Sequence, residues 1–261
     1  MSGDPDLARA APVLEAVRAA RPLVHCLTAT VSMAIVADGL LAAGARPMMT
    51  ETAAEAPVVT TMADALVINL GTLSTDAMEG IPPTVAAAVR DGRPWVLDPT
   101  AIGIAPVRTP LARQLLGSRP AVVRGNASEV LALTGAGPGG RGPDSSIVGD
   151  GTEVAVEHAA REVASRTGGA VSVSGEVDLV LDSQRRAQVA RGTAMLSRVT
   201  GTGCLLGALT AACAAVQPSA WEAAVAAVAW LDLAGELAAS RATGPGSFRM
   251  HLLDALDEVG R

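Results

Sequence analysis

Short runs of Val, Leu and Ile alternate along this chain with longer segments in which Ala and other apolar residues recur at helical spacing. Each run is short enough to be a buried strand, and each periodic segment is long enough to cross back over a sheet. This alternation is typical of a parallel sheet with helices on both faces. The runs predict strands at 22–27, 45–49, 65–70, 94–97, 121–124, 170–174 and 179–181.

The periodic segments predict helices at 33–43, 51–62, 77–91, 111–116, 128–133, 152–166, 203–216, 221–240 and 249–257. Residues 135–150 are rich in Gly and Pro, and this composition predicts a surface loop. Gly135, Gly137 and Gly140 match Gly-x-Gly-x-x-Gly, but they follow a helix and open none, so we reject a dinucleotide fingerprint. Without a repeat or a linker, we expect one α/β domain over residues 1–261.

Composition excludes several function classes. The net charge is −6 and no basic cluster occurs, which argues against nucleic acid or an anionic membrane as a partner. A Walker-type phosphate loop requires a lysine, and this chain has none. Cys26, Cys204 and Cys213 are odd in number and widely spaced, which favours the reducing cytoplasm. The longest apolar stretch, 204–216, is shorter than the ~20 residues that span a bilayer.

A glycine-rich turn stands out at Val199-Thr200-Gly201-Thr202-Gly203-Cys204, directly before an apolar helical segment. Glycines allow a close backbone approach to a ligand, and the free N–H groups and dipole of a helix start attract anions. Cys204 would lie in the first turn, where we expect a thiol to be shifted toward thiolate. Taken alone, the same residues also fit a tight turn with a small buried cysteine.

Polar side chains follow several predicted strands, at the edge where open α/β sheets bind ligands. Asp98 and Glu129 suit a hydrated magnesium ion, whereas Arg124 and Ser174 suit phosphate oxygens. Each residue also has a structural interpretation. Asp98 fits a turn, Arg124 fits an ion pair, and Asn126 with Glu129 fits a helix cap.

These segments together resemble the hydroxyethylthiazole kinase family of the ribokinase-like superfamily. The resemblance rests on 22–25, 39–45, 69–73, 97–99, 124–129, 174–178, 199–206 and 244–248, in family order. It implies a ribokinase-like three-layer fold and phosphorylation of the primary alcohol of 4-methyl-5-(2-hydroxyethyl)thiazole, with ATP and magnesium, in thiamine salvage. It also implies a homotrimer with active sites at subunit interfaces.

The resemblance assigns roles to individual residues. The nucleotide contacts it implies are Arg124, Ser174, Asn126 and Thr200, with Asp98 and Glu129 near the magnesium ion. The acceptor contacts it implies are Met49, Gly201, His25 and Thr28. Cys204 stands where sugar kinases of the superfamily carry an aspartate base, and the N–H groups of Gly201, Gly203 and their neighbours would stabilise the transferring phosphoryl group. His25 also fits a buried histidine with satisfied hydrogen bonds.

Two segments depart from the family pattern. After Thr28 the chain lacks the usual asparagines, and residues 98–104 read Asp-Pro-Thr-Ala-Ile-Gly-Ile in place of Asp-Pro-Val-Gly-Ala-Gly. The phosphate end therefore matches the family, and the acceptor end differs. Three alternatives stay open: a kinase of another heterocyclic or sugar-like alcohol, a nucleotide-dependent hydro-lyase on the same fold, and a ligand-binding relative without catalysis.

Overall fold

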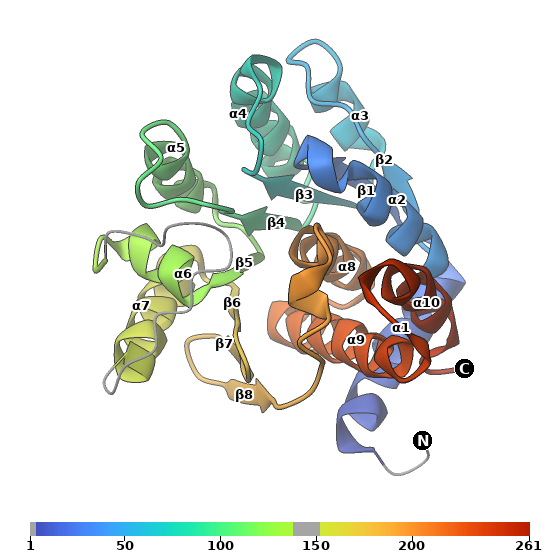
Figure 1. Ribbon diagram of the computed structural model, residues 1–261. Helices are drawn as coiled ribbons and strands as arrows, with labels where there is room; N and C mark the ends of the chain where they lie inside the picture. The colour runs from blue at the N-terminus through green and yellow to red at the C-terminus, as the bar shows by residue number, and fades with distance from the viewer. Residues whose placement is uncertain (1–3, 138–151) are drawn as a thin grey trace.

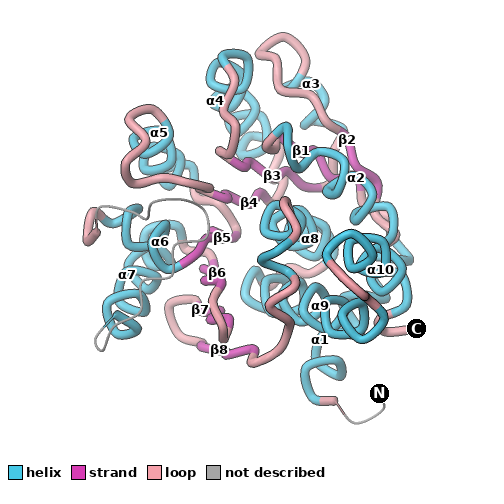
Figure 2. Tube along the Cα trace, viewed as in Figure 1, coloured by secondary structure: helices cyan, strands magenta, loops and turns pink. Residues whose placement is uncertain are grey.

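In the computed structural model, which describes residues 4–137 and 152–261, eight strands form one sheet in the order β2-β1-β3-β4-β5-β6-β7-β8. Neighbouring strands run parallel from β2 to β6, and β7 and β8 add an antiparallel hairpin at one edge. Figure 2 shows the strands as one twisted row through the molecule. Their bounds are β1 Leu23–Leu27, β2 Arg46–Met48, β3 Ala65–Asn69, β4 Trp95–Asp98, β5 Val122–Asn126, β6 Ala170–Ser174, β7 Asp178–Leu181 and β8 Arg186–Val189.

Helices cover both faces of the sheet, so the expected three-layer α/β fold is confirmed (Figure 1). One layer holds α1 Pro5–Ala20, α2 Met33–Ala42, α8 Thr202–Val216, α9 Ala220–Arg241 and α10 Pro245–Glu258. The other holds α3 Ala56–Met62, α4 Thr75–Arg90, α5 Arg108–Leu115, α6 Ala127–Thr134 and α7 Thr152–Thr167. Each layer encloses its own aliphatic core against the sheet.

Helix α9 is long and apolar enough to cross a membrane by length and composition, but 78% of its apolar window is buried inside the protein. It packs between α8, α10 and α1. A helix that is apolar on all sides and covered by its neighbours is a core helix.

The structure corrects the prediction at three elements. Helix α1 and strand β8 were not predicted, although Asp4 accepts hydrogen bonds from the first-turn N–H groups of α1. The helix predicted at 51–62 begins only at Ala56, because residues 51–55 form turns that pack against α4. A Cβ on Gly80 of α4 would lie 1.9 Å from the carbonyl oxygen of Glu51, which fixes that loop in place. Most of the predicted loop at 135–150, Gly140 included, lies outside the described residues.

The site depends on one consequence of this topology. Parallel strands β1, β3, β4, β5 and β6 end at the same edge of the sheet, which we call the carboxyl edge. Helix α8 contacts β1, β3 and β4, and it begins at that edge. Side chains at the ends of four strands therefore face the first turn of one helix.

Candidate active site

Arg124 is the centre of the polar groups at the carboxyl edge. Its Nη2 donates a 2.8 Å hydrogen bond to Ser174 Oγ at the end of β6. Its Nη1 lies 3.6 Å from Asp98 Oδ2 at the end of β4. Burial alone lowers the pKa of Arg124, but the negative charges of Asp98 and Glu129 outweigh it, and the pKa is raised. A permanently charged guanidinium is thus held at the place where three strands end.

The glycine-rich turn lies directly against this guanidinium. Gly201 is the N-cap of α8, with a φ of 93° that favours glycine. A Cβ on Gly203 would lie 2.9 Å from Arg124 Nη1, so this position admits no side chain while Arg124 stays in place. The first-turn N–H groups of α8 have no acceptor within the helix. The turn and Arg124 together place backbone N–H donors beside a guanidinium, an arrangement that suits phosphate oxygens.

Cys204 lies in the first turn of α8 and is hydrogen-bonded to two neighbours. Asn69 Nδ2 donates to its Sγ at 3.3 Å, and Ser32 also bonds to it. The expected shift toward thiolate is wrong for the protein alone. Burial raises the pKa of Cys204, and the nearby charge of Asp98 raises it further, against the smaller effects of Ser32 and Arg124. The helix start does not compensate for a buried thiol beside a carboxylate.

Asn69 and Thr100 connect the thiol to Asp98, and neither was predicted as a site residue. Asn69 Nδ2 donates to Thr100 Oγ1 at 2.9 Å, and Thr100 Oγ1 donates to Asp98 Oδ1 at 2.7 Å. Asn69 is the last residue of β3, and Thr100 follows β4 by two residues. Their position at strand ends was the available signal, because this edge collects polar side chains.

Glu129 serves the first turn of α6 and the loop after β4. Its Oε2 accepts from the N–H of Asn126 at 2.8 Å, and Asn126 Oδ1 accepts from the N–H of Glu129 at 3.0 Å, which confirms the helix cap. Its Oε1 accepts from the N–H of Ala101 at 2.8 Å. Burial, helped by the charge of Asp98, raises the pKa of Glu129 to about 7. Thr200, which was predicted as a nucleotide contact, is exposed in the glycine-rich turn before α8.

The carboxylates limit how a magnesium ion could be held. Asp98 is fully buried, and its Oδ2 accepts no hydrogen bond. Within residues 4–137 and 152–261 no three His, Cys, Asp or Glu side chains group closely enough to hold a metal. Magnesium is often bound by one or two carboxylates, with water and substrate phosphates completing the shell. The residues present fit that kind of site and not a cage made by the protein alone.

The residues predicted to contact the acceptor differ in their surroundings. His25 is fully buried, and its ring nitrogens bond to Thr60 Oγ1 at 2.7 Å and the carbonyl oxygen of Thr50 at 2.9 Å, as in the second interpretation of this residue. Thr28, directly after β1, is buried too, but its Oγ1 has no hydrogen-bond partner. Met49 follows β2, half-buried against the core.

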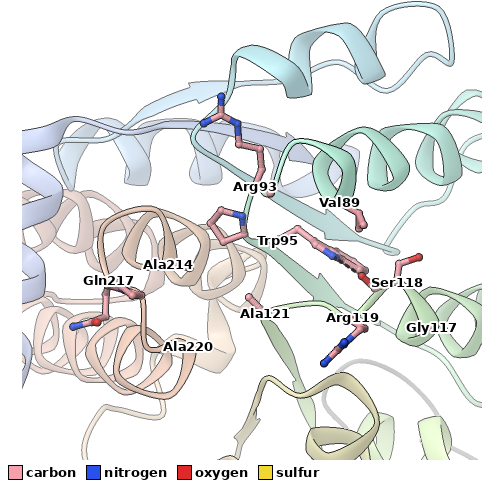
Figure 3. Close-up of a pocket in the computed structure, with 13 residues that line it drawn as sticks. Val89, Arg93, Trp95, Gly117, Ser118, Arg119, Ala121, Ala214, Gln217 and Ala220 are labelled. Carbon is pink, nitrogen blue, oxygen red and sulfur yellow. Dashed lines mark hydrogen bonds between the residues drawn. The ribbon is translucent and has the colours of Figure 1, made fainter.

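Two cavities lie at opposite edges of the sheet. One of about 470 Å³ lies where β4 and β5 begin (Figure 3), at the opposite end of β4 from Asp98. Its two arginines, Arg93 and Arg119, point away from each other there and bond to backbone carbonyls of Thr61 and Thr167. This cavity holds none of the predicted site residues.

The second cavity, of about 570 Å³, lies at the carboxyl edge between the start of α4 and the loop after β4. Leu73, Met78, Ile104 and Val107 give it an apolar wall, and it also borders Ala101, which is bonded to Glu129. The chemistry therefore gathers at the carboxyl edge, where this cavity adjoins the polar groups.

Comparisons with known proteins agree with this arrangement. The profile of the hydroxyethylthiazole kinase family matches residues 14–261. The hydroxyethylthiazole kinase of Kineococcus radiotolerans is 50% identical over 253 residues, which cover 95% of this chain and 90% of that protein. That of Granulibacter bethesdensis is 48% identical over 244 residues, covering 94% and 88%.

Solved structures give the same result. The structure of a hydroxyethylthiazole kinase protein from Pyrococcus horikoshii has a TM-score of 0.86 at 35% identity and covers 96% of this chain and 93% of its own. Pyridoxal kinase from Staphylococcus aureus in complex with ADP has a TM-score of 0.64 at 19% identity, covers 82% and 87%, and supports the fold alone. The chain belongs to the hydroxyethylthiazole kinase family.

Proposed function

We propose that this protein transfers the γ-phosphoryl group of ATP to the primary hydroxyl of 4-methyl-5-(2-hydroxyethyl)thiazole, with magnesium, as a step of thiamine salvage. The observation that carries the proposal is the position of Arg124. Its guanidinium touches Ser174 and Asp98 and lies against Gly203 at the start of α8. Phosphoryl transfer depends chiefly on positioning and charge neutralisation, which this arrangement supplies.

In this proposal each residue of the site has a separate role. Arg124 and Ser174 bind phosphate oxygens of the nucleotide, with Asn126 and Thr200 beside them. The N–H groups of 201–204 neutralise charge that develops on the transferring group. A magnesium ion, when bound through Asp98 or Glu129, would neutralise further phosphate charge. Since the Cys204 thiol is protonated at neutral pH, it would orient the acceptor hydroxyl and give only weak base assistance.

Fewer contacts in the structure support the predicted acceptor-binding residues. Thr28 directly follows β1 and offers a buried hydroxyl without a hydrogen-bond partner, and Gly201 packs against Ser32 and Ile35, a few residues further along the chain. Met49 would contribute an apolar contact to the acceptor. His25 would not contact the acceptor and would instead hold the loop after β2 through the carbonyl oxygen of Thr50. The loop at 98–104 borders the apolar cavity, so its altered residues would affect which acceptor fits.

A panel of primary alcohols tests the acceptor. We expect the thiazole alcohol to give the highest kcat/KM among heterocyclic and sugar-like alcohols, with the phosphate ester identified by mass. A higher kcat/KM for another alcohol would make this a different kinase of the family. Normal ATP affinity with no turnover on any alcohol would indicate a binding protein that has lost catalysis.

We further propose a single-domain chain that assembles as a cytoplasmic homotrimer with sites at subunit interfaces. The support lies at β2, an edge strand of the sheet. Met48 in β2 is exposed, and α2 and α3, which lie beside β2 in Figure 1, hold or adjoin four further exposed apolar residues: Val31, Leu41, Val58 and Met62. Exposed apolar residues gathered at one place favour a protein interface. Free thiols at all three cysteines fit a reducing compartment.

A further inference from the structure

Thr100 bridges the side chains at the ends of two neighbouring strands. Its Oγ1 donates its one hydrogen to Asp98 Oδ1 at 2.7 Å and accepts from Asn69 Nδ2 at 2.9 Å. Asn69 and Asp98 are themselves partners in the pairing of β3 with β4. In the family loop pattern valine stands at position 100, and valine could neither donate to the carboxylate nor accept from the amide. This chain therefore has a link that the usual family sequence lacks.

The Asn69 amide has an orientation that its neighbours determine. Its Oδ1 accepts from the N–H of Gly71 at 2.9 Å, so its Nδ2 faces Thr100 and Cys204. The two hydrogens of Nδ2 go to Thr100 Oγ1 and to Cys204 Sγ, the latter at 3.3 Å. A Cβ on Gly71 would lie 2.9 Å from Asn69 Oδ1 and 3.4 Å from Thr100 Cγ2, so the turn after β3 packs closely on both. The sulfur of Cys204 is thus an acceptor at one end of a directed chain of hydrogen bonds.

Asp98 is the anchor at the other end of this chain. Its side chain is fully buried, and among the described residues its Oδ2 has no hydrogen-bond partner. Oδ2 lies 3.6 Å from Arg124 Nη1, and a Cβ on Gly207 of α8 would lie 3.3 Å from it. A carboxylate enclosed by a guanidinium and a helix has little room to move. The Thr100 hydroxyl that is bonded to its other oxygen is therefore held in place too.

We propose that Thr100 is a positioning residue for phosphoryl transfer, because its hydroxyl fastens the Asn69 amide to Asp98 and so fixes where the Cys204 sulfur lies. This inference rests on the proposed function, in which Cys204 orients the acceptor hydroxyl. Without the Thr100 hydroxyl, Asp98 Oδ1 loses a donor in a buried place, and the Asn69 amide turns toward it and away from the sulfur. A thiol displaced in this way orients the acceptor less well, and small displacements at a reacting centre are costly.

Two substitutions at Thr100 separate its hydroxyl from its shape. Thr100→Val keeps the branched side chain and removes the hydroxyl, whereas Thr100→Ser keeps the hydroxyl. We expect Thr100→Val to lower kcat about 5- to 30-fold, measured as ADP release at saturating ATP and thiazole alcohol. Its KM for ATP should stay within about twofold of the wild type, since Arg124 and Ser174 keep their contact. Thr100→Ser should keep kcat within about threefold.

Two further variants complete the series. Thr100→Ala also lacks the hydroxyl, without the apolar branch of valine, and its kcat should fall by a similar factor. Thr109→Val is the matched control, because it removes a hydroxyl that accepts from the N–H of Gly103 in the same loop. It has no bond to the chain from Asp98 to Cys204, so its kcat should equal that of the wild type.

A background without the thiol shows whether Thr100 acts through Cys204. In Cys204→Ala there is no sulfur to position, so adding Thr100→Val should change kcat by less than about twofold. Equal kcat for Thr100→Val and Thr100→Ser, an equal loss in Thr109→Val, or an undiminished effect in the Cys204→Ala background would overturn the positioning role and leave the kinase proposal intact. A wild type that releases no ADP with any alcohol would overturn the kinase proposal and this inference with it.

Discussion

At the scale of single residues, the site is organised by Arg124 and by what surrounds it. Asp98 pairs with the guanidinium, Ser174 accepts from it, and Gly203 leaves it space. Cys204 is joined to Asp98 through Asn69 and Thr100. The sequence predicted Arg124, Asp98, Ser174 and Gly203 as site residues, because they stand at strand ends or at the helix start. It did not predict the burial and the nearby Asp98 charge that raise the pKa of the thiol, or the hydrogen bonds that connect the thiol to the carboxylate.

Cys204 gives the first prediction. An aspartate has a much lower free pKa than a thiol and would lie beside Arg124, so it should accept the hydroxyl proton better than the protonated thiol. Cys204→Asp should preserve or raise kcat, and Cys204→Ala should lower it, both measured at saturating ATP and acceptor. If the two variants lose activity equally, Cys204 serves packing at the helix start and takes no part in proton transfer.

Ala101 gives a second prediction. It has a φ of 60°, in the left-handed region, where the related family loop has glycine. Ala101→Gly should raise the free energy of unfolding by about 0.5–1 kcal/mol, since it removes strain. Denaturant titration measures this. Ala105→Gly, in the same loop at an ordinary φ, should lower it, and a loss of stability at both positions would argue against strain at Ala101.

At the scale of elements, the most informative prediction from sequence was that polar residues follow the strands. The strands from β1 to β7 were placed within a few residues, because their apolar runs are bounded by polar or turn residues. Strand β8 was missed because it alternates exposed polar with buried apolar residues over four positions only. Helix α1 was missed because its apolar face is weakly marked, although Asp4 and Pro5 form a recognisable start.

Helix α8 gives the third prediction, at Gly203. Alanine there favours the helix but pushes a methyl group into the Arg124 guanidinium. Gly203→Ala should therefore raise the KM for ATP about 5- to 30-fold. Its melting temperature should not fall. Gly117→Ala, where a Cβ meets nothing within 4 Å, is the control and should leave KM unchanged. An unchanged KM for ATP in Gly203→Ala would show that Arg124 does not bind the nucleotide.

Helix α6 gives the fourth prediction, through the cap at Glu129. Its pKa is raised from 4.5 to about 7, so the folded protein keeps a proton that the unfolded chain releases. The free energy of unfolding should therefore fall as pH rises from about 4.5 through about 7. Glu129→Gln should reduce this slope in denaturant titrations across that range, and the exposed Glu153→Gln should not. An unchanged slope in Glu129→Gln would show that Glu129 is ionised throughout.

At the scale of the whole molecule, the topology explains why residues distant in sequence act together. Parallel strands bring Asn69, Asp98, Arg124 and Ser174 to one edge, and α8 brings Cys204 to meet them. The sequence pattern predicted that edge. The hydrogen bonds from Asn69 to Thr100 and from Thr100 to Asp98 could not be predicted, because only the fold brings these residues together.

Assembly gives the fifth prediction. The chain has a mass of 26.1 kDa, and the wild type should sediment as a trimer. Met62→Glu places a charge among the exposed apolar residues near β2 and should yield monomers. Val154→Glu, at a still more exposed apolar position on α7, should leave the trimer intact. A monomeric wild type, or the same mass for both variants, would show that the surface near β2 is not a trimer interface.

The central claim is that the carboxyl edge carries out phosphoryl transfer to an alcohol. The most direct test is the rate of ADP release by the purified protein with ATP and magnesium, with and without the thiazole alcohol. We expect release that depends on the alcohol, with one phosphate ester formed for each ADP. ADP release that is absent, or that is the same without the alcohol, would contradict the account.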